Sequence, residues 1–144
     1  VDVALTYAKA TLLDDRFTTD LLPLAESRGV GLINAAAVSL GLLTMGGSKA
    51  SLGHPAGDPL RESAARMVDY ARQHGLDIAF LANQYSIQRS GAATTLIGTG
   101  NPRHLDAAIS AATAPIDQEA LADVLAMRPP LGERGWQVGL PENN

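Results

Sequence analysis

Apolar and polar positions along the chain follow an order of short strands and amphipathic helices. Aliphatic and β-branched runs predict buried strands, which we expect at residues 1–6, 30–34 and 94–97. Apolar residues three and four positions apart predict helices with one buried face, at residues 18–28, 58–74, 77–88, 102–112 and 118–128. Strand–helix units in series predict an α/β fold whose parallel sheet is covered by helices.

The expected helix boundaries carry residue types that stabilise helix ends. Asn101 and Asp117 are suitable N-cap residues, and Pro102 suits a first helical position. Gly29 suits the C′ position that closes the first helix. On the helix that begins at Pro102, the spacing of apolar residues predicts a buried face, formed by Leu105, Ala108, Ile109 and Ala112.

The length of 144 residues predicts a single domain. We divide it into residues 1–40, a loop at 41–57, helices with the last strand at 58–128, and a tail at 129–144. Three parallel strands alone leave two open edges, so we expect self-association through them or membership of a larger sheet or barrel. The chain begins at Val1 without an initiator methionine and enters a strand at once, so we expect either a piece of something longer or a chain whose beginning was lost.

Composition excludes several classes of function. The formal charge of −4 without any basic cluster argues against a nucleic-acid partner. The absence of cysteine excludes disulfides and thiol chemistry. We find no signal peptide, no apolar run long enough to span a membrane and no metal-ligand spacing. We therefore expect a soluble, cytoplasmic protein without a metal site.

The turn after the third predicted strand is the strongest candidate for a binding site. Gly98 and Gly100 allow a sharp turn and a close approach to a ligand. A helix capped by Asn101 directs free N–H groups and its positive dipole end at the turn, as in a phosphate site. Taken alone, the same residues also fit an ordinary structural turn.

Several ordered segments resemble the C-terminal part of the aldo-keto reductase family, in its branch of sugar dehydrogenases. The segments that carry the resemblance are residues 1–7, 29–44, 81–87 and 95–100. The resemblance implies a partial (β/α)8 TIM barrel, with this chain supplying strands six to eight and their helices. It further implies that the loop at 41–57 folds over a dinucleotide.

The resemblance also implies an activity. Family members transfer a hydride between a carbonyl or alcohol and a nicotinamide cofactor, and this branch oxidises an aldose to a lactone. Their catalytic Tyr, Lys, Asp and His lie in earlier strands, so we expect no catalytic residue here. Tyr7, Lys9 and Asp14 offer suitable chemistry but are too close in sequence to be that group.

Cofactor binding is what the resemblance assigns to this chain. It implies contacts to the dinucleotide from two loops, at Ala36, Val38, Ser39, Gly41 and Leu42, and at Gly98, Thr99, Gly100, Asn101 and His104. NADP-preferring members place Lys and Arg where Gly98 and His104 stand, so NAD is expected over NADP, although Arg103 is adjacent. Ala35 stands where an aromatic ring often stacks on the nicotinamide.

Other residues are expected to act near a sugar substrate or to be structural. Tyr7 is expected to line the substrate pocket or to pack, and Trp136 to cover substrate or to hold the tail. His54 is expected to be a solvated loop residue, and His74 to favour the end of its helix. The alternative to an enzyme part is a non-catalytic half-barrel that assembles with copies of itself.

Overall fold

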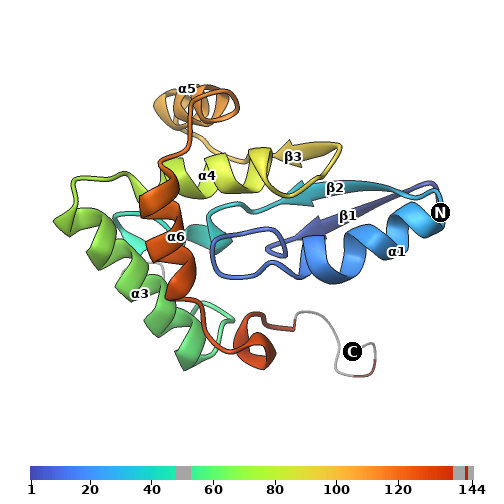
Figure 1. Ribbon diagram of the computed structural model, residues 1–144, viewed down its shortest axis with the longest axis horizontal. Coiled ribbons are helices and arrows are strands. Elements are labelled where there is room, and N and C mark those ends of the chain that lie inside the picture. The colour runs from blue at the N-terminus through green and yellow to red at the C-terminus, as the bar shows by residue number, and fades with distance from the viewer. Residues whose placement is uncertain (48–52, 138–141, 143–144) are drawn as a thin grey trace.

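The computed structural model describes residues 1–47, 53–137 and 142. Its centre is a parallel sheet in the order β1 (Val3–Tyr7), β2 (Gly31–Ala35) and β3 (Thr94–Leu96). Leu5 pairs with Ile33, and Ile33 pairs with Thr94. Because the strands are parallel, their carboxyl ends lie at one edge of the sheet, which faces left in Figure 1. The predicted α/β fold is therefore confirmed, and it is consistent with part of a barrel.

The predicted helices are present, and most of their ends lie within a residue or two of the expected positions. They are α1 (Leu22–Ser27), α3 (Asp58–Gln73), α4 (Ile78–Gln88), α5 (Pro102–Ala111) and α6 (Gln118–Ala126), with 3₁₀ turns η2 (Ser39–Gly41) and η3 (Leu131–Glu133). Asn101 and Asp117 cap α5 and α6 through their side chains, as predicted. Gly29 has a φ of 65° just beyond α1, in agreement with its predicted C′ role.

The first predicted helix differs in its first turn. Residues Phe17–Leu21 form a π-helical turn, η1, before α1 begins. Pro23 lacks an N–H and its ring would clash with the carbonyl four residues earlier, so a regular α-helix is disfavoured through this turn.

Two groups of buried side chains form the interior. A small core packs under one face of the sheet, where Leu32 meets Ala10, Phe17 and Ala25. The larger core lies beyond the carboxyl ends of the strands, between α3, α4 and α6; its largest buried members include Leu12, Leu13, Leu43, Leu60, Met67 and Ile78. Tyr70 of α3 also donates a hydrogen bond of 2.7 Å to Asp123 of α6, which raises the pKa of Tyr70 to about 12.

The opposite face of the sheet is open, and here the prediction of buried strands is wrong. Val3, Leu5 and Leu96 all point to this face and are 55%, 58% and 47% exposed. Parallel sheets are ordinarily covered on both faces. Apolar composition predicts that a strand is suited to burial, but it does not show whether the same chain supplies the covering elements.

The predicted buried face of α5 is also largely wrong. Ala108 is buried, whereas Ala112 is exposed and Leu105 and Ile109 are 45% and 63% exposed. Helical periodicity identifies an apolar stripe without identifying its partner. Among the described elements, α4 packs against α5, yet Leu105 and Ile109 of this stripe remain exposed.

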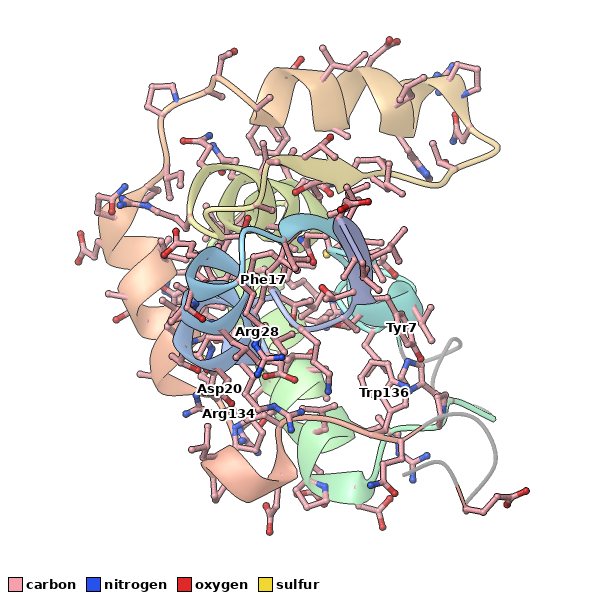
Figure 2. The ribbon with its side chains drawn as sticks, turned by 90° about the vertical axis from the view of Figure 1, so that its right-hand side faces the viewer. Tyr7, Phe17, Asp20, Arg28, Arg134 and Trp136 are labelled. Carbon is pink, nitrogen blue, oxygen red and sulfur yellow. The ribbon has the colours of Figure 1, made fainter. Side chains whose placement is uncertain are left out.

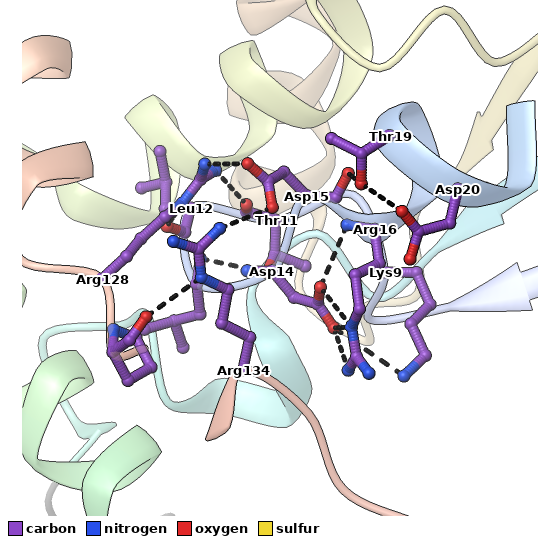
Figure 3. A network of polar contacts seen from close by, with 12 residues as sticks. Lys9, Thr11, Leu12, Asp14, Asp15, Arg16, Thr19, Asp20, Arg128 and Arg134 are labelled. Atoms are coloured by element: carbon purple, nitrogen blue, oxygen red, sulfur yellow. Dashed lines mark hydrogen bonds and ion pairs between the residues drawn. The ribbon is translucent and has the colours of Figure 1, made fainter. Parts of the chain in front are cut away.

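A polar network joins the loop after β1 to the C-terminal segment (Figure 3). Arg128 donates hydrogen bonds to the carbonyls of Leu12 (2.7 Å) and Thr11 (3.0 Å) and pairs with Asp15 (2.7 Å). Arg134 binds the second carboxylate oxygen of Asp15 at 2.7 Å. The two arginines therefore attach the segment after α6 to the carboxyl end of β1.

A second polar chain attaches α4 to the sheet. Asn34 of β2 is fully buried and donates a 2.7 Å hydrogen bond from Nδ2 to Ser86 Oγ. Ser86 Oγ in turn donates a 2.7 Å bond to the carbonyl of Ala10. These two bonds fix the positions of β2, α4 and the loop after β1 relative to one another.

Among the described helices, none is both long and apolar enough to cross a membrane.

We predict that Arg128→Met lowers the free energy of unfolding by about 2–3 kcal/mol, because it leaves two carbonyls and one oxygen of the Asp15 carboxylate without their partner. Arg128 is only 9% exposed, whereas Arg72 is 56% exposed and pairs with Asp69 alone. The control Arg72→Met is expected to stay within about 0.5 kcal/mol of the parent. Urea unfolding measures both, and equal losses would contradict the structural role of Arg128.

Candidate functional site

The loops after β2 and β3 meet at the carboxyl edge of the sheet. They enclose a cleft of about 470 Å³, which we call the strand-end cleft. The start of α4 and the first turn of α5 complete its walls. Its lining residues are Ala36, Ala37, Val38, Thr44, Met45, Gly46, Asp77, Ala79, Phe80, Asn83, Leu96, Ile97, Gly98, Thr99, His104 and Ala107.

The cleft brings together half of the predicted cofactor residues, namely Ala36, Val38, Gly98, Thr99 and His104. Gly41, Gly100 and Asn101 belong to the same two loops but do not line it. Ser39 is buried, and Leu42 packs in the larger core at 3% exposure. The cofactor role of all these residues stays a prediction.

The turn after β3 leaves its backbone donors free. Thr99 Oγ1 accepts a 3.1 Å hydrogen bond from the N–H of Asn101, whose own side chain accepts one from Arg103. Among the described residues, the N–H groups of Gly98, Thr99 and Gly100 make no hydrogen bond. The turn therefore presents unpaired donors beside the positive end of the α5 dipole.

Neither glycine of this turn is required by its backbone conformation. Gly98 and Gly100 have no left-handed φ. A Cβ at either position would meet nothing within 4 Å. Within the chain itself, a side chain would be tolerated at both positions.

The backbone of the loop after β2 is strained. The residue types in this loop do not predict that strain. Ala36, Ser39 and Leu40 have φ values of 62°, 49° and 54°, a region that residues with a Cβ seldom adopt. Such conformations persist only where surrounding contacts hold them. Their concentration beside the cleft marks this loop as a functional candidate.

His54 supplies one of these contacts, and the prediction that it is solvated is wrong. It is 9% exposed, and its Nε2 lies 3.0 Å from the carbonyl of Ser39. The N–H of Ala56 donates to Nδ1 at 3.0 Å, so Nδ1 carries no proton and Nε2–H donates to Ser39. The imidazole of His54 thus holds the strained loop in place. The adjacent Gly and Pro residues that indicated a loop gave no signal of this burial.

The strand-end cleft contains one carboxylate and no Lys or Arg among its described lining residues. Asp77 caps α4 by accepting hydrogen bonds from the N–H groups of Ala79 and Phe80 at 2.9 and 3.2 Å. The groups that favour an anion here are therefore the backbone donors of the turn after β3. Within the described residues, no three His, Cys, Asp or Glu side chains are placed to hold a metal ion.

Tyr7 is predicted to line the substrate pocket or to pack, and Trp136 to cover substrate or to hold the tail; the two side chains lie together in a second depression (Figure 2). Trp136 Nε1 donates a 2.9 Å hydrogen bond to the Tyr7 hydroxyl, and the ring centroids are 6.0 Å apart, edge to face. The ring of His54 lies 5.0 Å from that of Trp136. We call this depression of about 360 Å³ the aromatic hollow; it is lined by Thr6, Tyr7, Ala8, Lys9, Leu21, Gly135, Trp136 and Gln137.

The two sites are connected through His54. Its imidazole contacts Trp136 on one side and holds the loop after β2 through Ser39 on the other.

Comparison with known proteins identifies the family to which this chain is similar. The family model of the Aldo/keto reductase family matches residues 1–128. L-galactose dehydrogenase of Arabidopsis thaliana is 32% identical over 147 aligned residues. The alignment covers 99% of this chain and 45% of the plant protein, so the chain spans less than half the length of this relative.

We predict that Tyr7→Phe and Trp136→Phe each lower the free energy of unfolding by about 1 kcal/mol, because each removes the same hydrogen bond. The double variant is expected to lose less than the sum of the two. Chemical denaturation followed by circular dichroism measures the cycle. Tyr85→Phe is the control, since its hydroxyl makes no hydrogen bond within the described residues. Additive losses would show that the two side chains are not coupled.

Proposed function

Because the chain belongs to the aldo/keto reductase family, we propose that it holds the dinucleotide of an NAD(P)-dependent oxidoreductase that oxidises an aldose to a lactone. The sugar class rests on the similarity to a relative named L-galactose dehydrogenase. The observation that carries the proposal is the strand-end cleft, where the loops after β2 and β3 converge. In this proposal the chain corresponds to strands six to eight of the barrel.

The turn after β3 is the proposed phosphate site. Its three free N–H groups, at Gly98, Thr99 and Gly100, are suited to phosphate oxygens, and the α5 dipole adds a favourable potential. The absence of side chains at the two glycines keeps those donors accessible. The backbone conformation does not need glycine at these two positions. The close approach of a ligand is therefore the physical reason that remains for glycine there.

The bound nicotinamide would supply the hydride acceptor for oxidation of the sugar. This chain's own contribution is to orient the cofactor in the strand-end cleft and to shape the neighbouring hollow with Tyr7 and Trp136. The family's proton-transferring Tyr, Lys, Asp and His are expected from earlier strands, so Tyr7 is a wall of the site in this proposal. Its hydroxyl accepts the indole N–H of Trp136, which supports a positional role.

The charges around the cleft favour NAD over NADP. A 2′-phosphate is ordinarily held by Lys or Arg through charge-assisted hydrogen bonds. The described lining contains neither residue and contains the carboxylate of Asp77. Arg103 is exposed at the start of α5 and does not line the cleft.

We predict that Gly98→Ala weakens NADH binding about tenfold, because its methyl group occupies space beside the phosphate donors. Its free energy of unfolding is expected to change by less than about 0.5 kcal/mol, as the methyl meets no atom of the chain. NADH fluorescence and urea unfolding measure the two quantities.

The matched control for this test is Gly29→Ala. Gly29 has a φ of 65° and lies after α1, away from the cleft. The control is expected to lose about 1 kcal/mol of stability without loss of NADH affinity. Unchanged NADH affinity in Gly98→Ala would contradict the assignment of the phosphate site.

The uncovered sheet face supports the second candidate, a half-barrel that assembles with copies of itself. Val3 and Leu5 on β1, and Leu105 and Ile109 on α5, expose large apolar side chains. Such surfaces, together with unpaired strand edges, favour association. This candidate does not require that a nucleotide bind.

If copies associate through this face, the 144-residue chain is expected to sediment as a dimer or larger species. Leu5→Lys is expected to shift it towards the monomer, because an ammonium group disfavours burial. The control Leu24→Lys changes an equally exposed leucine on α1 and is expected to have no effect. Analytical ultracentrifugation distinguishes these cases, and a monomer at every concentration would exclude self-assembly.

A further inference from the structure

The polar network that joins the loop after β1 to the C-terminal segment contains more positive than negative charges, although the whole chain is acidic. Lys9 and Arg16 share the carboxylate of Asp14, and Arg128 and Arg134 share that of Asp15. Asp20 is the third carboxylate near Arg16. Four cations of this network therefore face three carboxylates, which leaves one positive charge in excess (Figure 3).

The excess charge lies on Lys9. Asp14 is 1% exposed and accepts hydrogen bonds from Arg16 Nε at 3.0 Å and Nη2 at 2.7 Å, as well as from the Arg16 N–H. These bonds raise the pKa of the Arg16 guanidinium and satisfy the carboxylate. The Lys9 ammonium lies 3.7 Å from Asp14, beyond hydrogen-bond distance, and its side chain is 30% exposed. It therefore has donors available for another group.

Lys9 reaches the aromatic hollow beside the residues already placed there. Among the described lining residues it is the only charged one, with Tyr7 and Trp136 as neighbours. Gly135 passes directly over the cation pair, where a Cβ would lie 3.1 Å from Lys9 Nζ. Because Gly135 has no side chain, Lys9 lies against the C-terminal segment and forms part of the wall of the aromatic hollow.

We propose that the aromatic hollow binds a monosaccharide that carries a carboxylate, and that Lys9 Nζ is the partner of this carboxylate. The inference rests on the proposed function, because it names the class of sugar for the same site. The volume of about 360 Å³ is within the range of small-molecule sites. A phosphate dianion fits less well, since Arg16 is engaged by Asp14 and only one cation is available.

The test compares two sugars that differ in one carboxylate. D-galacturonate and D-galactose are titrated into the 144-residue chain at neutral pH and low salt, with Trp136 as the single tryptophan reporter and calorimetry as the second readout. The parent is expected to bind galacturonate about fivefold more tightly than galactose. This preference is expected to decrease as salt is added.

Two substitutions assign the preference to Lys9. Lys9→Gln is expected to bind both sugars equally, whereas Lys9→Arg retains the preference. Arg72→Gln removes the same charge at an exposed position on α3 and is expected to behave as the parent. Circular dichroism of each variant verifies that it is folded.

NADH titration of the same samples separates this inference from the proposed function. Equal affinity of the parent for both sugars, binding of neither sugar, or a preference that survives Lys9→Gln each overturns the inference while NADH binding is retained. Loss of NADH binding with an intact carboxylate preference instead overturns the proposed cofactor role and leaves the hollow's specificity established.

Discussion

Parallel pairing of β1, β2 and β3 is the constraint on which the candidate site depends. In a parallel sheet every strand ends at the same edge, so the segments that follow the three strands are brought together there. The strand-end cleft lies between the segments after β2 and β3, and the aromatic hollow lies beside the segment after β1. An antiparallel arrangement of the same strands would separate these segments.

The same edge is stabilised by polar side chains that reach it from distant parts of the chain. Arg128 and Arg134 attach the C-terminal segment to the loop after β1, and Trp136 then reaches Tyr7. His54 joins that contact to the strained loop after β2. The contacts that stabilise this edge of the sheet and the candidate binding residues are therefore joined directly to one another.

Sequence predicted what local physics controls. The cap residues Asn101 and Asp117 and the glycine after α1 place helix ends correctly, because hydrogen bonds within a few residues decide them. Burial was predicted less well, since Leu5 and Ile109 are apolar but are more than half exposed, at 58% and 63%. The convergence of Ala36 and Gly98 was expected from the family resemblance. The burial of His54 depends on a contact 15 residues away, which no local pattern reports.

The central claim is that the turn after β3 binds the phosphates of a dinucleotide, and an amide NMR titration with NADH tests it most directly. The account predicts the largest shifts at the amides of Gly98, Thr99 and Gly100, with smaller ones at Ala36 and Val38. The amides of Gly29 and Gly132 are expected to remain unchanged. Shifts absent from the turn, or confined to the aromatic hollow, would contradict the account.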